Sequence, residues 1–306
     1  MVVGGGIRPI CWPPASSQDS EERQVMKLLS YVKNGRPCYG LITPDGVVNA
    51  SARLGQTYPS LRDVLEAGAL LDLQAIAAEP PDHAIEEIEF DLPIPNALKI
   101  LCAGRNYPAY HEVQADGGPK FPSIFARLAH SFAPQGQSLQ VPKACPSLDY
   151  ECELVAVIGK GGSHIQQDDA LSHVMGYTIM NEGTVRNWSK AGTQNFPGKN
   201  FDRCGSLGPW IITEDEIADP SLLHITTRRN GDIVQDGGTS QMFFDIPYLI
   251  SHISEFLTLA PGDMIATGSP GGSIMGSDHP NWLRDGEDMT FEISGIGVLR
   301  NPVTVT

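Results

Sequence analysis

Short apolar runs separated by glycine- and proline-rich turns constrain the fold of this chain most. From Leu98 onward these runs include KILCAG, LVAVIG, HVMGYTIM, PWIIT and DMTFEISGIGVL. Two segments here have helical spacing, DIPYLISHISEF and the shorter QDDALSHV. Many short strands punctuated by turns predict a β-rich, rolled or barrel-like body.

A compact and different pattern precedes this body, from Val25 to about Ala97. KLLSYVKNGRPCYGLITPDGVVNAS predicts two or three short strands joined by Asn-Gly and Asp-Gly turns. SLRDVLEAGALLDLQAIAAE has helical spacing, with Ser60 as the N-cap, and PPDHAIEEIEFDLPIP closes the unit as a loop and strand. We predict a mobile arm over residues 1–24, a small N-terminal α/β domain over 25–97 and a larger domain over 98–306.

Charge and cysteine usage exclude several classes of partner. The formal net charge of −15 argues against a nucleic-acid partner and disfavours anionic membranes. No apolar run approaches the ~20 residues of a membrane span, and the first residues, MVVGGGIRPICWPPASSQDSEER, lack the pattern of a secretory signal. The six cysteines form no CxxC pair and show no zinc spacing. We therefore expect reduced thiols in a cytoplasmic protein.

Three carboxylates occupy alternate positions in DYECELVAVIGK: Asp149, Glu151 and Glu153. In a strand, residues two apart point to the same face. Two unit charges about 4 Å apart repel by roughly 4 kcal/mol at an effective dielectric of about 20. The fold can avoid this cost in three ways: one carboxylate is protonated, both side chains point into the solvent, or a cation lies between them. An exposed strand end with solvated glutamates is the plainer interpretation, but the apolar run that follows disfavours exposure and leaves a metal site open.

A second acidic centre and a lysine follow further along the chain. Glu182 stands at the end of the apolar run VMGYTIM, where functional groups are often presented. Together with Glu151 and Glu153 it would make an all-oxygen site, which suits Mg²⁺, Mn²⁺ or Ca²⁺ and not zinc. Lys199, in NFPGKNF, could polarise a substrate carbonyl or be an ordinary loop lysine. The chain has no P-loop, no GxGxxG opening a βαβ unit, no HExxH and no GxSxG.

These motifs occur together in a recognisable order. DYECEL, GYTIMNEGTVRNW, GKNFDRCGSLGPW, NG…Q…TSQMFFDIPYLISHIS (whose isolated Q is Gln235) and TLAPGDMIATGSPGG follow one another with sensible spacings. From about Ile100 to Val305 the chain resembles the fumarylacetoacetate hydrolase family, and in particular its bacterial acylpyruvate, maleylpyruvate and fumarylpyruvate hydrolases. The resemblance implies an α+β, β-rich fold: a mixed β-roll of this family's type as the catalytic domain, with a small N-terminal domain, in a homodimer.

The resemblance also implies roles for particular residues. The metal ligands would be Glu151, Glu153 and Glu182, holding Mg²⁺ or Mn²⁺, or Ca²⁺. Lys199 would be catalytic and lie near the substrate oxygen. The substrate-binding residues implied are Arg186, Ser269, Tyr110 and Arg105.

The sequence departs from the family pattern at three places. Glu182 stands where the hydrolases mostly have aspartate, and glutamate there is similar to the family's hydratase and decarboxylase branch. The lid motif G-x-N-Y-x-x-H-x-x-E reads GRNYPAYHEV, so Tyr110 and Val113 fill the histidine and glutamate positions, while His111 and Glu112 are each one residue off. One residue is about 100° of rotation on a helix. The family's SARDWQ is TVRNWS here.

These departures leave two enzymatic activities open. The first is hydrolysis of a C–C bond in an acylpyruvate-like 2,4-dioxo acid, with His111 and Glu112 activating water. A positioned general base is worth about 10²–10⁴ in rate, and without it the metal and Lys199 would still stabilise an enolate. The second is therefore a lyase or isomerase (a decarboxylase, hydratase or tautomerase) acting on a related 2-oxo acid. A non-catalytic homologue is a third possibility, which the intact set of carboxylates and lysine disfavours.

Overall fold

The computed structural model describes residues 26–108 and 118–306. The predicted arm over residues 1–24 lies outside the described residues, and so do Tyr110, His111 and Glu112.

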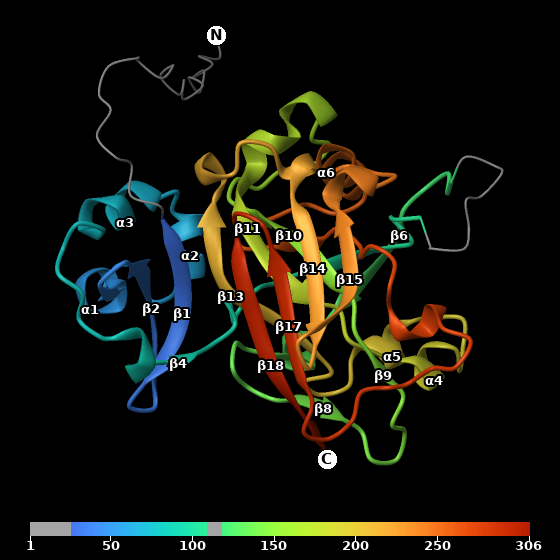
Figure 1. Ribbon diagram of the computed structural model, residues 1–306. Helices are drawn as coiled ribbons and strands as arrows, with labels where there is room; N and C mark the ends of the chain where they lie inside the picture. The colour runs from blue at the N-terminus through green and yellow to red at the C-terminus, as the bar shows by residue number, and fades with distance from the viewer. Residues whose placement is uncertain (1–25, 109–117) are drawn as a thin grey trace, which may run out of the picture.

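A mixed sheet of eleven strands runs through the described part of the chain (Figure 1). Its main path has the order β3-β2-β1-β13-β11-β10-β16-β5-β6, with β4 beside β1 and β7 beside β13. The bounds are β1 (Lys27–Lys33), β2 (Arg36–Thr43), β3 (Gly46–Asn49), β4 (Glu89–Phe90), β5 (Ile100–Gly104), β6 (Ser123–Arg127), β7 (Phe132–Ala133), β10 (Cys152–Ile158), β11 (Val174–Asn181), β13 (Gly205–Thr213) and β16 (Met264–Ala266). Most neighbours are antiparallel, whereas β16–β5 and β13–β7 are parallel.

A second sheet lies across the first and closes the roll. It has the order β15-β14-β17-β18-β8, and in Figure 1 its orange and red strands cross in front of β10 and β11. Its strands are β8 (Leu139–Val141), β14 (His224–Arg229), β15 (Asp232–Gly238), β17 (Asp288–Ile293) and β18 (Gly297–Val305). Phe291 and Leu299 of this sheet share one buried cluster with Leu154 and Ile179 of the first. The prediction of a β-rich mixed roll is therefore confirmed.

Few helices accompany the sheets. The α-helices are α1 (Ala50–Leu54), α2 (Leu61–Glu66), α3 (Leu70–Ile76), α4 (Arg186–Ser189), α5 (Phe196–Lys199) and α6 (Ile246–Ser254). The 3₁₀ helices are η1 (Ile85–Glu87), η2 (Ala129–Ser131), η3 (Gln167–His173), η4 (Glu214–Glu216), η5 (Pro220–Leu222), η6 (Thr239–Gln241) and η7 (Ile274–Gly276). DIPYLISHISEF forms α6, whose N-cap Asp245 accepts a hydrogen bond from the Tyr248 N–H at 2.8 Å. QDDALSHV forms η3 and so has 3₁₀ rather than α geometry.

The N-terminal unit contains the three short strands expected from its turns. Asn34 (φ 52°) and Gly35 (φ 73°) both adopt the left-handed region between β1 and β2, as a type I′ hairpin turn requires. Ser60 caps α2 in a capping box with Asp63. Strand β1 pairs with β13, so this unit adds its strands to the sheet of the roll. The boundary near residue 97 stays a proposal.

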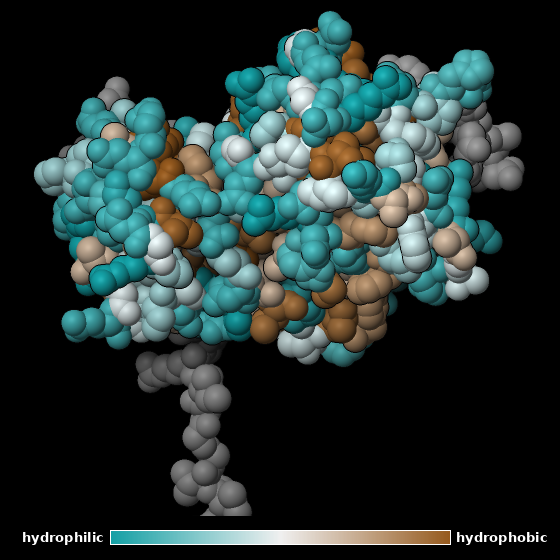
Figure 2. Space-filling view, turned by 90° about the horizontal axis from the view of Figure 1, so that it is seen from below, coloured by the Kyte–Doolittle hydropathy of each residue, from teal (hydrophilic) through white to brown (hydrophobic). Residues whose placement is uncertain are grey.

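The surface is mostly polar on the face shown in Figure 2, where hydrophobic residues gather in separate patches among hydrophilic ones. Among the described residues, no helix is long and apolar enough to cross a membrane.

Candidate functional site

Antiparallel pairing brings the acidic segments together. In the β10–β11 ladder Cys152 lies opposite Asn181, so Glu151 and Glu182 meet just beyond its end. The Glu182 N–H donates to the Glu151 carbonyl oxygen at 2.7 Å. The same two segments then pair again as β9 (Leu148–Asp149) and β12 (Thr184–Val185). The glutamates therefore lie at an interruption between two ladders, where side chains from both segments converge.

Lys199 joins this group from α5. Its Nζ lies 2.7 Å from Oε2 of Glu151 and 2.5 Å from Oε2 of Glu182. Lys199 is 5% exposed and Glu182 3%. The alternative of a loop lysine on the surface is excluded.

Arg186, the first residue of α4, closes the other side of the cluster. Its Nη2 lies 2.7 Å from Oδ2 of Asp149 and 3.0 Å from Oε1 of Glu151. Asp149 is fully buried and also accepts hydrogen bonds from the backbone N–H groups of Ile274 and Met275. The guanidinium of Arg186 is thus paired with two carboxylates, and its predicted role in binding substrate stays a prediction.

Glu153 connects the cluster to the glycine-rich loop after β16. Its Oε2 accepts the Gly268 N–H at 2.8 Å. The next residue, Ser269, accepts a hydrogen bond at 2.9 Å from Nε2 of Gln235, whose Oε1 accepts the Cys152 N–H. Ser269 is half-buried and directly follows Gly268, which contacts Glu153, while its role in binding substrate stays a prediction.

Burial and neighbouring charges shift the acidities of the cluster. Burial, reinforced by the negative charges of Glu182 and Glu151, raises the pKa of Glu153 well above its ordinary value. Burial alone would also raise the pKa of Glu151, but Arg186 and Lys199 outweigh it and lower that pKa to about 2. Burial works to lower the pKa of Lys199, yet Glu151 and Glu182 raise it. Lys199 is therefore held as an ammonium.

The donor set fits a divalent cation, although the described side chains do not surround one point as metal ligands. Within the described residues, no group of three or more His, Cys, Asp or Glu stands in such an arrangement. The Lys199 ammonium instead occupies the space between Glu151 and Glu182. The raised pKa of Glu153 favours its neutral form, so the ionised Asp149, Glu151 and Glu182 carry −3 against the +2 of Lys199 and Arg186, which leaves −1.

One oxygen in the cluster has no partner. Oε1 of Glu182 is buried and has no hydrogen-bond partner among the described residues. A buried polar atom left unpaired is costly. Carboxylate oxygens at a site of surplus negative charge are the ligands that Mg²⁺ and Mn²⁺ accept.

The other predicted residues are less closely connected to the cluster. Arg105 is exposed, at a left-handed backbone position (φ 59°) after β5. The next residue, Asn106, is buried and donates hydrogen bonds to the carbonyls of Phe244 and Thr267, both at 2.8 Å. The predictions for Tyr110, His111 and Glu112 concern residues outside the described ranges.

Sequence reasoning assigned no role to three residues of the site. The alternation of carboxylates pointed to Asp149, but it did not indicate that Asp149 anchors Arg186. Thr184, whose hydroxyl donates to Oε2 of Glu151 at 3.1 Å, gave no recognisable signal, whereas Gln235 stood within a family motif without an assigned role. Their contacts span 33 and 83 residues of sequence.

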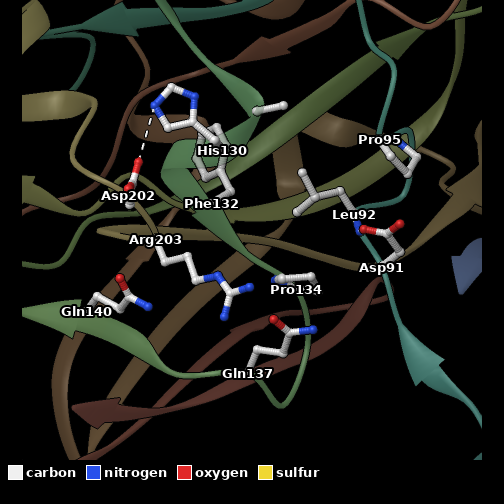
Figure 3. A pocket seen from close by; sticks show the side chains of 11 residues that line it. Asp91, Leu92, Pro95, His130, Phe132, Pro134, Gln137, Gln140, Asp202 and Arg203 are labelled. Carbon is white, nitrogen blue, oxygen red and sulfur yellow. Dashed lines mark hydrogen bonds and ion pairs between the residues drawn. The ribbon is translucent and has the colours of Figure 1, made fainter. Parts of the chain in front are cut away.

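Two surface hollows lie outside the cluster. One of about 670 Å³ lies between residues 91–95 and the roll, with Arg203, Gln137 and Gln140 around it and an ion pair of His130 with Asp202 at its edge (Figure 3). The other, of about 450 Å³, includes Gln235 and the glycine loop in its wall. Neither hollow has the clustered glutamates in its lining.

Comparison with known proteins agrees with this arrangement. The family model described as the C-terminal region of fumarylacetoacetate hydrolase matches residues 99–304. The chain belongs to the fumarylacetoacetate hydrolase family.

Relatives in this family have a range of activities. A mitochondrial oxaloacetate tautomerase of Homo sapiens is 36% identical over 274 residues, covering 87% of each chain. An oxaloacetate tautomerase of Bacillus subtilis is 37% identical, covering 72% of this chain and 75% of its own. The solved fumarylacetoacetate hydrolase of Exiguobacterium antarcticum has a TM-score of 0.81 and 32% identity, covering 92% of this chain and all of its own.

This membership confirms the resemblance inferred from the motifs. The human relative is mitochondrial by name, so the expectation of a cytoplasmic protein stays a prediction. The homodimer also stays a prediction.

Proposed function

We propose that this chain is a divalent-metal-dependent tautomerase that interconverts the keto and enol forms of a short 2-oxo acid, with oxaloacetate as the first substrate to test. The observation that carries the proposal is the buried Lys199 ammonium, which lies between the carboxylates of Glu151 and Glu182. The activity printed for the human and Bacillus subtilis relatives supports it.

Keto–enol interconversion needs less from the protein than hydrolysis does. One proton leaves C3 to a solvent water and one joins the oxygen on C2 from Lys199, which solvent then reprotonates, so that no C–C bond breaks and no water is consumed. The critical step is therefore stabilisation of the enolate charge on that oxygen. The described residues meet this requirement, because they hold the Lys199 ammonium in a buried position.

Lys199 supplies the donor for this oxygen. An ammonium has three N–H donors, and two of them point to Glu151 and Glu182. The third can donate to the C2 oxygen as its charge develops. Because the two carboxylates raise the pKa of Lys199, the proton stays on Nζ until the substrate oxygen takes it.

Glu151, Glu153 and Glu182 would hold Mg²⁺ or Mn²⁺, or Ca²⁺. A divalent cation bound there acts as a Lewis acid that polarises the substrate carbonyl. Asp149 fixes Arg186 against Glu151, which keeps one carboxylate oriented within the cluster. Ser269, held by Gln235, is a hydrogen-bonding group for the substrate carboxylate.

Hydrolysis of an acylpyruvate is the second candidate. The likeness to the fumarylacetoacetate hydrolase of Exiguobacterium antarcticum favours it. Hydrolysis requires a base that activates water, and the predicted base, His111 with Glu112, lies outside the described residues.

One experiment separates the two candidates. Purified protein is mixed with enol-enriched oxaloacetate and, separately, with a panel of acylpyruvates, in Mn²⁺ or Mg²⁺ and then in excess chelator. We expect metal-dependent acceleration of the enol absorbance change with no change in mass. Metal-dependent release of pyruvate and a free acid from an acylpyruvate, without acceleration of tautomerisation, would replace the proposal with the hydrolase.

A further inference from the structure

Arg127, the last residue of β6, is a buried cation in unusual surroundings. Its exposure is 2%. Among the described residues, no carboxylate forms an ion pair with it. Burying a charge without a partner is expensive, so its position calls for an explanation.

The contacts of Arg127 are made with backbone carbonyls, a hydroxyl, a sulfur atom and an aromatic ring, all of them uncharged. Nη1 donates to the Gly183 carbonyl at 3.2 Å, and Nη2 lies 3.2 Å from Sγ of Cys204. On its near side, Nε donates to the Ser131 hydroxyl at 3.3 Å. The guanidinium lies over the ring of Phe132, 4.3 Å from its centroid.

Gly183, which accepts from Arg127, is the residue directly after Glu182. Its backbone lies so close to the segment before β13 that a Cβ added there would be 1.7 Å from the Cys204 carbonyl oxygen, so no side chain fits. Gly205 is equally confined, since its added Cβ would meet both Nη atoms of Arg127 at 3.0 Å. The guanidinium therefore joins the turn that carries Glu182 to the start of β13.

Glu182 depends on this turn for its direction. It stands between the end of β11 and the start of β12, outside both ladders. Its carboxylate contacts Lys199 through one oxygen, while the other has no partner among the described residues. The position of the Glu182–Gly183 peptide group sets the direction in which the Glu182 side chain leaves the backbone. It therefore helps to determine where the unpaired oxygen points.

We propose that Arg127 is a positioning residue for the metal-ligand carboxylate of Glu182, acting through the Gly183 carbonyl. This inference rests on the metal site of the proposed function. The fork of the guanidinium is the essential feature, because it holds Gly183 and Cys204 at once. A lysine in its place keeps the charge but reaches one acceptor.

The test measures Mn²⁺ affinity by titration calorimetry on the full chain stripped of metal. Arg127→Met is expected to lower the affinity about 10–100-fold, the usual effect of losing a group that orients a metal ligand. Arg127→Lys is expected to fall between that variant and the unchanged protein. Ser131→Ala, which removes one support of the guanidinium, provides a milder variant if Arg127→Met does not fold.

Arg229 provides the matched control. Its side chain is also mostly buried and donates to two backbone carbonyls, those of Asn281 and Trp282, but it lies on β14 and pairs with Glu287. Arg229→Met should lose thermal stability as Arg127→Met does while keeping its Mn²⁺ affinity. This comparison separates positioning of Glu182 from general support of the fold.

The possible outcomes separate a failure of this inference from a failure of the proposed metal-dependent function. If the unchanged protein binds Mn²⁺ and both Arg127 variants bind it equally well, the role of Arg127 is wrong and the metal site stands. If Arg127→Met binds Mn²⁺ more tightly while Arg127→Lys is unchanged, Arg127 acts through its charge alone, and positioning is again refuted. If the unchanged protein binds no Mn²⁺, both proposals fail.

Discussion

The ammonium of Lys199 lies 2.5 Å from Oε2 of Glu182, in a part of the molecule almost closed to solvent. A lysine and a glutamate so placed depend on one another, because removing either leaves the other as an uncompensated buried charge. The same pair places a proton donor beside carboxylates that suit a divalent cation. The function and the stability of this region are therefore coupled.

Replacing Lys199 tests this coupling directly. Lys199→Met should lower the tautomerase rate by about 10²–10³, the usual effect of losing one donor to a developing oxyanion. It should also destabilise the metal-free chain by about 3–5 kcal/mol, because Glu151 and Glu182 lose their shared cation. Steady-state kinetics and urea unfolding in chelator measure the two effects. Lys190→Met, an exposed lysine in the same loop, should change neither.

Glu182→Gln keeps the shape of the side chain and removes its charge. The Mn²⁺ affinity should fall by at least about tenfold. Losing a residue that only orients a metal ligand already costs about that much, and this variant loses the charge of the ligand itself. The rise in melting temperature on adding Mn²⁺ should shrink in proportion. Glu292→Gln, an exposed change on β17, serves as the control. An unchanged Mn²⁺ titration in Glu182→Gln would exclude Glu182 as a ligand.

Asp149 is expected to matter for folding as well as for the site. Asp149→Asn removes the charge that Arg186 contacts at 2.7 Å in a fully buried place. Breaking a buried ion pair from one side typically costs about 3–5 kcal/mol. Urea denaturation should show this loss, whereas the exposed Asp169→Asn should match the unchanged protein. If Asp149→Asn loses no more stability than Asp169→Asn, Glu151 alone satisfies Arg186.

The N-terminal unit has an acid-sensitive contact of its own. Burial works to raise the pKa of Asp82, but the Asn49 N–H and the Arg53 guanidinium outweigh it and lower that pKa below the ordinary 3.8. Since the folded pKa is below the unfolded one, the contribution to stability is present above the unfolded pKa and is lost as pH falls through the folded pKa. Asp82→Asn should therefore lose stability at neutral pH and little near pH 2, as followed by thermal unfolding across this range. Equal losses at both pH values would contradict it.

The local sequence determined much of the fold. Asn34 and Gly35 specified the β1–β2 turn, because few residues other than glycine and asparagine accept a positive φ. Ser60 and Asp63 specified the start of α2 through hydrogen bonds within four residues of chain. The alternation of Asp149, Glu151 and Glu153, with the family motifs, identified the acidic segment and Glu182 before any contact was known.

The tertiary structure alone decided how these parts meet. Lys199 reaches Glu151 across 48 residues of sequence, and Arg127 reaches Gly183 across 56. Arg186 pairs with Asp149, a contact that the sequence did not indicate, and its role in binding substrate stays a prediction. Side-chain alternation and turn chemistry act within a few residues, so the sequence expresses them directly. Strand register and the pairing of buried charges depend on how distant segments pack together. Both are therefore fixed only when the two sheets pack around the cluster.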